Sequence, residues 1–325
     1  MKLKGKLITC AALVTATTGT IHFINRVVNC IDTMENLVND SNGEYYEWRF
    51  GKIFYTKQGE GSPILLIHDL NAMSSQNEWN HIISDLSKTN TVYALDLLGC
   101  GQSDKPNLTY TNYLYVQLIT DFIKHIIGEK TDVIATGDSS SFIIMSCAND
   151  KEIINKIMLV NPTSLLVLAK IPTKRSRLIK ELIGLPIIGT LLYNILINKK
   201  SIEDEFYSTY YYNPHNIDEN QILQYLECSQ KENTHSKYLY ASIKSRYTNA
   251  NIMHCLNSID NSIYIIVGDG NPEYELAANQ YENQVPAIEI IDITESKYLP
   301  QLEKPQEFLE QVNILFTNEE TITAE

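Results

Sequence analysis

The sequence predicts an α/β fold with a mostly parallel central sheet, flanked by helices and carrying a helical cap inserted after strand six. Two observations predict this architecture. Short apolar, β-branched runs alternate with helix-like segments, which is the pattern of strands buried in a parallel sheet. Residues 163–258 interrupt the alternation with about a hundred residues that hold several helical patterns and no strong strand.

Length and composition favour one large domain and exclude several classes of protein. A chain of 325 residues with 44% hydrophobic residues can bury the core of a single α/β domain. The net charge of −13 argues against nucleic acid as a partner. The six cysteines contain no CxxC pair, so neither a zinc site nor a disulfide framework is expected. Without a Gly-rich phosphate loop or metal-ligand spacing, we expect no cofactor and no metal.

Residues 1–40 differ from the rest and predict a membrane anchor with a linker. Three lysines precede the stretch Leu7–Ile24, which is almost uncharged but contains five threonines. Its length is near the minimum for a membrane span. The alternative is an amphipathic helix lying on the body of the protein. The lysines before the stretch favour a cytoplasmic N-terminus and an extracytoplasmic body, so we expect membrane association through this single segment.

The core is predicted from residues 41–162 and 259–316. It begins with a hairpin, "YYEWRF" and "KIFYTKQG". Six further strands follow in the order "SPILLIHDL", "TVYALDLLG", "TDVIATG", "KIMLVNP", "SIYIIVG" and "AIEIIDI". Residues 163–258 are expected to cover the carboxyl ends of these strands, where open α/β sheets bind ligands. The acidic residues 317–325 are predicted to be a loose tail.

One cap segment, Leu178–Asn198, is apolar around most of its circumference. It has two interpretations. Its helices can pack on the body, or they can form an acyl-binding tunnel or a lipid-contacting surface. The second interpretation predicts a small apolar or acyl-containing ligand as the binding partner.

A serine-rich stretch, "ATGDSSSFIIMS", joins a predicted strand to a predicted helix. Gly137, Ser139 and Ser141 fit the G-x-S-x-G pattern of a nucleophile elbow, except that serine replaces the last glycine. Serines at a helix N-terminus are also ordinary caps, so this motif alone leaves both readings open.

Two motifs upstream carry a family resemblance. "LLIHDLNAMSSQNEW" holds His68 and Asp69 at a strand end, and "YALDLLGCGQSDKP" holds D-x-x-G-x-G-x-S-D. With the serine turn and a "LPQLEKP" stretch, the chain resembles the α/β-hydrolase superfamily, in particular the esterase, lipase and haloperoxidase-like group with a cap. The resemblance runs from about Tyr45 to Val312.

The resemblance implies specific roles for residues at the serine turn. Ser139 takes the position of the nucleophile, and the backbone N–H groups of Leu70 and Ser140 take the positions of the oxyanion hole. His68 and Asp69 belong to the oxyanion-loop motif, where Asp69 replaces the glycine of the family. Two fixed amides and a helix N-terminus would stabilise a developing negative charge.

The base and the acid of the triad are degenerate. Tyr298 takes the position of the family histidine, and a tyrosine with a pKa of about 10 is a poor base at neutral pH. Asn271 takes the position of the family acid. Asp269 could serve as a shifted acid, and Asn161 stands at the other place where relatives carry it. The histidines of the cap that could act as an unorthodox base are His215, His235 and His254.

Two functions therefore follow from the sequence. The first is a membrane-associated serine hydrolase for ester or acyl substrates, with Ser139 as nucleophile and an unorthodox base. The alternative is a catalytically inactive pseudo-hydrolase that binds an acyl-like or carboxylate ligand, or a partner.

Overall fold

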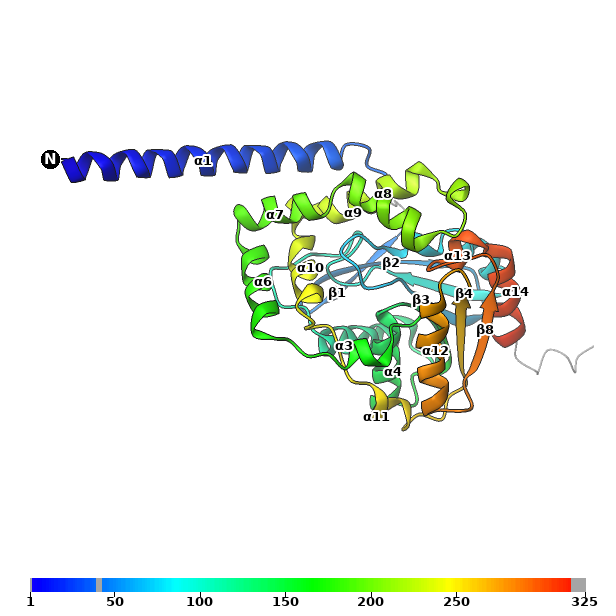
Figure 1. Ribbon diagram of the computed structural model, residues 1–325. Helices are drawn as coiled ribbons and strands as arrows, with labels where there is room; N and C mark the ends of the chain where they lie inside the picture. The colour runs from blue at the N-terminus through cyan, green and yellow to red at the C-terminus, as the bar shows by residue number, and fades with distance from the viewer. Residues whose placement is uncertain (1, 39–42, 317–325) are drawn as a thin grey trace, which may run out of the picture.

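The protein is described by a computed structural model that covers residues 2–38 and 43–316. The predicted acidic tail, residues 317–325, lies outside the described residues. Figure 1 shows a twisted sheet with helices on both faces, a layer of helices above it and a long N-terminal helix.

The sheet has eight strands in the order β1-β2-β4-β3-β5-β6-β7-β8. The hairpin β1 (Glu44–Trp48) and β2 (Gly51–Gln58) pairs antiparallel, and β2 also joins β4 antiparallel. The other pairings are parallel. Their strands are β3 (Ser62–Ile67), β4 (Asn90–Leu95), β5 (Thr131–Thr136), β6 (Ile154–Val160), β7 (Ile263–Gly268) and β8 (Glu289–Ile293). The hairpin and all six predicted strands are confirmed.

Successive residues of the central strands face opposite sides of the sheet, so both faces need an apolar cover. Leu65 and Ile67 belong to one buried cluster, while Ile64 and Leu66 belong to another. This two-sided burial explains why the strands read as continuous apolar runs.

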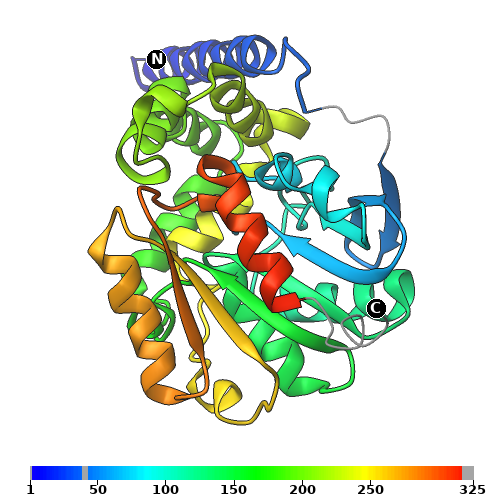
Figure 2. The same cartoon turned by 90° about the vertical axis from the view of Figure 1, so that its right-hand side faces the viewer.

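Helices cover each face of the sheet. One face carries α3 (Asn112–Phe122), α4 (Ser139–Asn149), α11 (Met253–Leu256) and α12 (Pro272–Gln284). The other carries a short 3-10 turn (Gln76–Trp79), α2 (Ile83–Leu86) and α14 (Pro305–Phe316), which crosses the sheet in Figure 2. A short helix, α13 (Pro300–Glu303), precedes α14.

Between β6 and β7 the chain is helical, with no strand in residues 163–258. Its helices are α5 (Leu165–Leu168), α6 (Lys174–Gly184), α7 (Ile188–Leu196), α8 (Lys199–Glu205), α9 (Glu219–Thr234), α10 (Ser236–Lys244) and α11. Tyr210, Tyr211 and Tyr225 form a buried aromatic cluster with Met73 and Leu299. This cluster joins the cap to two loops at the carboxyl ends of the strands.

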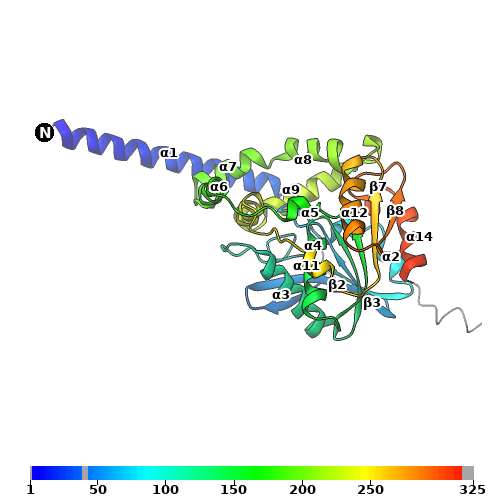
Figure 3. The same cartoon turned by 60° about the horizontal axis from the view of Figure 1, so that its bottom comes forward.

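The N-terminal segment forms one helix, α1 (Lys2–Asp32), which lies beside the cap helices α7 and α9 (Figures 1 and 3). In the described part of the chain, no single helix has the length and apolar character needed to cross a membrane. Helices α6 and α7 would meet those criteria as a pair, but they are bent by 106°.

Candidate functional site

The turn between β5 and α4 is centred on Gly137. β5 ends at Thr136, Gly137 has φ +55°, and Asp138 already has helical angles of −62° and −30°. The left-handed region is open to glycine without steric strain, so the chain reverses at Gly137 and the helix begins two residues later. Ser139 is not among the described residues with positive φ.

Ser139 therefore does not occupy the strained turn that its position in the motif implies. It lies in the first turn of α4, with none of its surface exposed. Its Oγ donates a hydrogen bond to the backbone oxygen of His68 at 2.7 Å. The hydroxyl group is thus buried and already bonded. The physical reason for this correction is that glycine, two residues earlier, takes the left-handed conformation.

Of the two expected oxyanion donors, Ser140 differs from the expectation. Ser140 is fully buried, and its N–H donates to the oxygen of Gly137 at 3.2 Å within the turn. That N–H is therefore committed to the backbone. Leu70 is buried in the apolar cluster on one face of the sheet.

Asp69 instead reaches the turn with its side chain. Its Oδ1 accepts the N–H of Asp138 at 3.0 Å. Its carboxyl group also accepts a hydrogen bond from the hydroxyl of Tyr298. The N–H of Asp69 donates to Oε2 of Glu78 at 3.0 Å, which fixes the backbone of the loop after β3. The carboxyl group of Asp69 therefore occupies the space in front of the first amide after Gly137.

Tyr298 lies in the loop between β8 and α13, with its hydroxyl against the same turn. A Cβ atom on Gly137 would stand 2.0 Å from this hydroxyl and 2.3 Å from Oδ1 of Asp69. The ring of Tyr298 stacks on Tyr210, with centroids 5.7 Å apart. Burial, followed by the charge of Asp69, raises the pKa of Tyr298 well above its ordinary value of 10.0. The phenol thus stays protonated and acts as a donor.

Three carboxyl groups surround the turn, of which Asp69 and Glu78 are buried and Asp138 is half-buried, and desolvation raises the pKa of each. The pKa of Glu78 rises to about 7, although the Asp69 amide and the hydroxyls of Ser74 and Tyr225 oppose the rise. The pKa of Asp69 is raised by burial and then by the neighbouring Asp138 and Glu78. Burial also raises the pKa of Asp138, against a hydrogen bond from Thr163. The site is therefore acidic by composition but holds its protons more tightly than exposed carboxyl groups do.

The candidate acids do not meet Tyr298. Asn271 caps α12 by accepting the N–H of Glu273 at 3.1 Å. Asp269 is exposed at the end of β7, where its N–H donates to the oxygen of Ile293 at 3.3 Å. Neither Asn271 nor Asp269 is therefore placed to orient the hydroxyl of Tyr298.

Asn161, at the end of β6, has the role that sequence reasoning missed. Its Nδ2 donates to the backbone oxygens of Lys297 at 2.9 Å and Tyr298 at 3.0 Å. Its Oδ1 accepts the N–H of Gly268 at 3.1 Å. Asn161 therefore holds the Tyr298 loop in position. The sequence signal is its place at a strand end, where the family resemblance implies only a replacement acid.

The histidines have local partners or lie on the surface. His68 is fully buried, with Nε2 accepting the N–H of Leu97 at 3.0 Å, and burial lowers its pKa. His68 is thus a neutral structural residue. In the cap, His235 packs on Tyr238, while His215 and His254 are exposed.

A cavity of about 400 Å³ opens beside Tyr298, between α5 and α12. It lies at the carboxyl ends of β6 and β7, the edge at which open α/β sheets bind ligands. Its lining includes Asn161, Thr163, Tyr274, Gln280 and Tyr298 together with apolar side chains of α12. The cavity combines hydrogen-bonding groups with an apolar wall.

No family model matches the chain. Two curated relatives are similar over part of their length. A 2-hydroxy-6-oxo-6-(2'-aminophenyl)hexa-2,4-dienoic acid hydrolase of Metapseudomonas resinovorans is 28% identical over 115 residues, which are 35% of this chain and 40% of the relative. A soluble epoxide hydrolase of Corynebacterium sp. (strain C12) is 24% identical over 110 residues, 34% of this chain and 38% of the relative. The chain thus matches less than half the length of these relatives.

Solved structures match over nearly the whole fold. A bromoperoxidase from Bacillus anthracis has a TM-score of 0.68 at 12% identity, covering 85% of this chain and 100% of the other. A structure described as a membrane phospholipase A, a bacterial virulence factor, has a TM-score of 0.66 at 16% identity and covers 96% of this chain and 98% of the other. These similarities show that the chain shares their fold.

Proposed function

Because the chain has the α/β-hydrolase fold, we propose that it is a hydrolase-like protein that has lost serine catalysis and binds a ligand in the cavity beside Tyr298. The observation that carries this proposal is the identity of the residue at the β5–α4 turn. A serine nucleophile in this fold stands on the sharp strand-to-helix turn. Here the turn residue is Gly137, which has no side chain.

The groups around Gly137 support the loss of catalysis. The Tyr298 hydroxyl and the Asp69 carboxyl fill the space into which a nucleophilic side chain would project. The N–H of Asp138, the first amide after the turn, is accepted by Asp69 and is not free for an oxyanion. A phenol with a raised pKa does not act as a general base near neutral pH. Nucleophile, base and oxyanion donor are therefore each replaced.

The chemistry of the cavity favours an uncharged acyl compound over a carboxylate. The amide of Asn161 and the hydroxyl of Thr163 are already bonded within the protein, so the wall offers the Nε2 group of Gln280 as a donor, together with apolar contacts from α12. Glu273 also lines it, and the carboxyl cluster of Asp69 and Asp138 lies behind Tyr298. An anionic ligand would meet repulsion here, whereas an ester carbonyl can accept hydrogen bonds without it.

The competing function is a serine hydrolase that uses Ser139. Intact-mass labelling with a fluorophosphonate distinguishes the two. We expect no adduct on the wild type. The triple variant Asp69→Gly/Gly137→Ser/Tyr298→His restores a side chain at the turn, a base and space for an oxyanion, and should become labelled. An adduct on the wild type that disappears in Ser139→Ala would overturn the proposal.

Ligand binding is tested separately by thermal unfolding with methyl octanoate and with octanoate. We expect the ester to raise Tm more than the carboxylate does. The variant Ala277→Phe fills the cavity from α12 and should abolish the shift. An equal shift in Ala277→Phe would place binding elsewhere and contradict this part of the proposal.

A further inference from the structure

Helix α1 meets the rest of the protein through its polar side. Asn25 is 6% exposed, and its Nδ2 donates to the oxygen of Ile187 at 3.0 Å. The adjacent Arg26 donates to Asn233, and one turn further Asn29 donates to the backbone oxygen of Gln230. These contacts dock α1 on α7 and α9 through polar side chains.

The apolar side chains of the same segment point away from the body. Phe23, Ile24, Val27 and Ile31 are 68%, 43%, 39% and 62% exposed. A surface helix of a water-soluble protein normally buries its apolar stripe and exposes its polar one. In α1 the arrangement is inverted, so its outer side lacks the apolar cover that its composition requires.

The neighbouring cap helices extend this apolar surface. Leu178 and Leu182 on α6, and Ile188, Leu192 and Ile195 on α7, are spaced three or four residues apart and are exposed. Of the 26 large hydrophobic side chains that are exposed in the described residues, 11 lie within 166–196 and 6 lie on α1. The exposed apolar surface is therefore concentrated on these neighbouring elements, and such concentration marks an interaction site.

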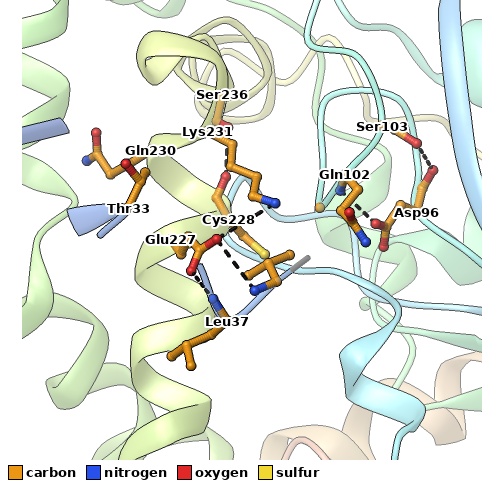
Figure 4. Close-up of polar contacts among 12 residues, drawn as sticks. Thr33, Leu37, Asp96, Gln102, Ser103, Glu227, Cys228, Gln230, Lys231 and Ser236 are labelled. Atoms are coloured by element: carbon orange, nitrogen blue, oxygen red, sulfur yellow. Dashed lines mark hydrogen bonds and ion pairs between the residues drawn. The ribbon is translucent and has the colours of Figure 1, made fainter. Parts of the chain in front are cut away.

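The segment that follows α1 is bonded to the cap helix α9. Glu227 on α9 is 2% exposed, and its carboxylate accepts the N–H groups of Leu37 at 2.6 Å and Val38 at 3.4 Å. Lys231 stands 3.7 Å from the same carboxylate (Figure 4). The chain following α1 is thus tied to the cap, and α1 lies beside α7 in two views that differ by 60° (Figures 1 and 3).

Charge identifies the occupant of this surface. Residues 166–200 contain one acidic residue, Glu181, in a chain whose net charge is −13. The same stretch carries seven basic residues: Lys170, Lys174, Arg175, Arg177, Lys180, Lys199 and Lys200. Lys199 is paired with Glu219 at 2.8 Å and Lys180 with Glu181 at 3.4 Å, and the other five form no ion pair with a carboxylate of the described residues. Apolar side chains flanked by cations match acyl chains beneath anionic headgroups. A second copy of the chain would bring the same cations together.

We propose that the outer side of α1 and the exposed sides of α6 and α7 form one face that inserts into the surface of an anionic lipid bilayer. The 106° bend between α6 and α7 then presents a corner to the membrane instead of a span. This inference does not depend on whether the cavity beside Tyr298 binds a ligand.

The test uses full-length protein and vesicles of phosphatidylcholine and phosphatidylglycerol, with or without brominated acyl chains. The two native tryptophans, Trp48 and Trp79, are buried in the body. Ile195→Trp places a third on α7, where the side chain is 62% exposed, and Ile314→Trp places the control on α14, where it is 70% exposed. We expect bromine to quench Ile195→Trp emission and to leave Ile314→Trp at the wild-type level.

Two further outcomes decide the proposal. Co-sedimentation without quenching of Ile195→Trp would show that α1 alone attaches the protein, and would overturn a joint face. A stable dimer in the absence of vesicles, again without quenching, would assign the surface to a second copy. The variant Arg175→Gln/Arg177→Gln should weaken binding to anionic vesicles by about fivefold for each charge removed. An unchanged affinity would contradict the role of the cations.

Discussion

The hydroxyl of Tyr298 lies 2.0 Å from the point at which a Cβ atom would stand on Gly137. The two residues are therefore complementary, since the tyrosine fits only because the turn residue has no side chain. The same space also receives Oδ1 of Asp69, 2.3 Å from that point. The contact joins the loop after β8 to the turn after β5 through side chains that leave no room for a nucleophile.

Gly137→Ala should destabilise the protein by about 3 kcal/mol or more, because alanine disfavours φ +55° and its Cβ meets both oxygens. Chemical unfolding measures the change. In the background Asp69→Gly/Tyr298→Phe the loss should become smaller, because only the backbone strain remains. Gly184→Ala is the control, since a Cβ there meets nothing within 4 Å. Equal losses at both glycines would contradict the packing described for Gly137.

Ser139→Ala should lower the free energy of unfolding by about 1 to 3 kcal/mol, because the buried oxygen of His68 loses its donor. The same experiment reports on structure independently of activity. If the Ser139 hydroxyl were instead free to act as a nucleophile and not bonded to His68, its removal would change the free energy of unfolding little. Urea unfolding of both proteins at one pH is sufficient to measure the difference.

The strands were predictable because the central strands are apolar on both sides, and the hydrophobic runs therefore mark β3 to β7 directly. The absence of a strand in 163–258 likewise followed from composition. At the serine turn, however, small residues allow two registers: Gly137 followed by Ser139, or Ala135 followed by Gly137. Only the backbone angle of Gly137 selects between them, and a pattern of residue types does not contain that angle.

The position of Tyr298 was predictable from the prolines and the glutamate that follow it, but its partners were not. Asp69 is separated from Tyr298 by more than two hundred residues, and their meeting depends on the sheet order. The role of Asn271 was similarly hidden, because the same residue type can hold a histidine or cap a helix.

Two asparagines provide a matched comparison at the end of neighbouring strands. Asn161→Asp should destabilise the protein by about 3 kcal/mol, because a carboxylate replaces the amide that donates to the oxygens of Lys297 and Tyr298. Asn271→Asp should change stability by less than about 0.5 kcal/mol, because aspartate caps a helix as well as asparagine does. Equal effects in unfolding at neutral pH would contradict the roles assigned to the two residues.

Glu78 should make stability depend on pH. Its pKa is raised from 4.5 to about 7 in the folded protein, so the folded state binds more protons between these values. The free energy of unfolding therefore falls as pH rises through this window. Between pH 5 and pH 8 the contribution is about 2.5 kcal/mol.

The variant Glu78→Gln cannot titrate and should lose this part of the pH dependence, while keeping an acceptor for the N–H of Asp69. Unfolding curves of both proteins across the range measure the difference in slope. The slopes that remain in both report the other carboxyl groups with raised pKa values, such as Asp69 and Asp138. Parallel curves for wild type and variant would rule out a titrating Glu78 in this range.

The docking of α1 has a consequence for the order in which the protein is made. Asn29 is bonded to Gln230, which lies 201 residues later in the chain. At a synthesis rate of about 5 to 20 residues per second, α1 is translated roughly 10 to 40 seconds before its partner. During that interval the cap helices have not yet been synthesised. A lipid surface or targeting factor can therefore bind the apolar side chains of α1 before the rest of the protein folds.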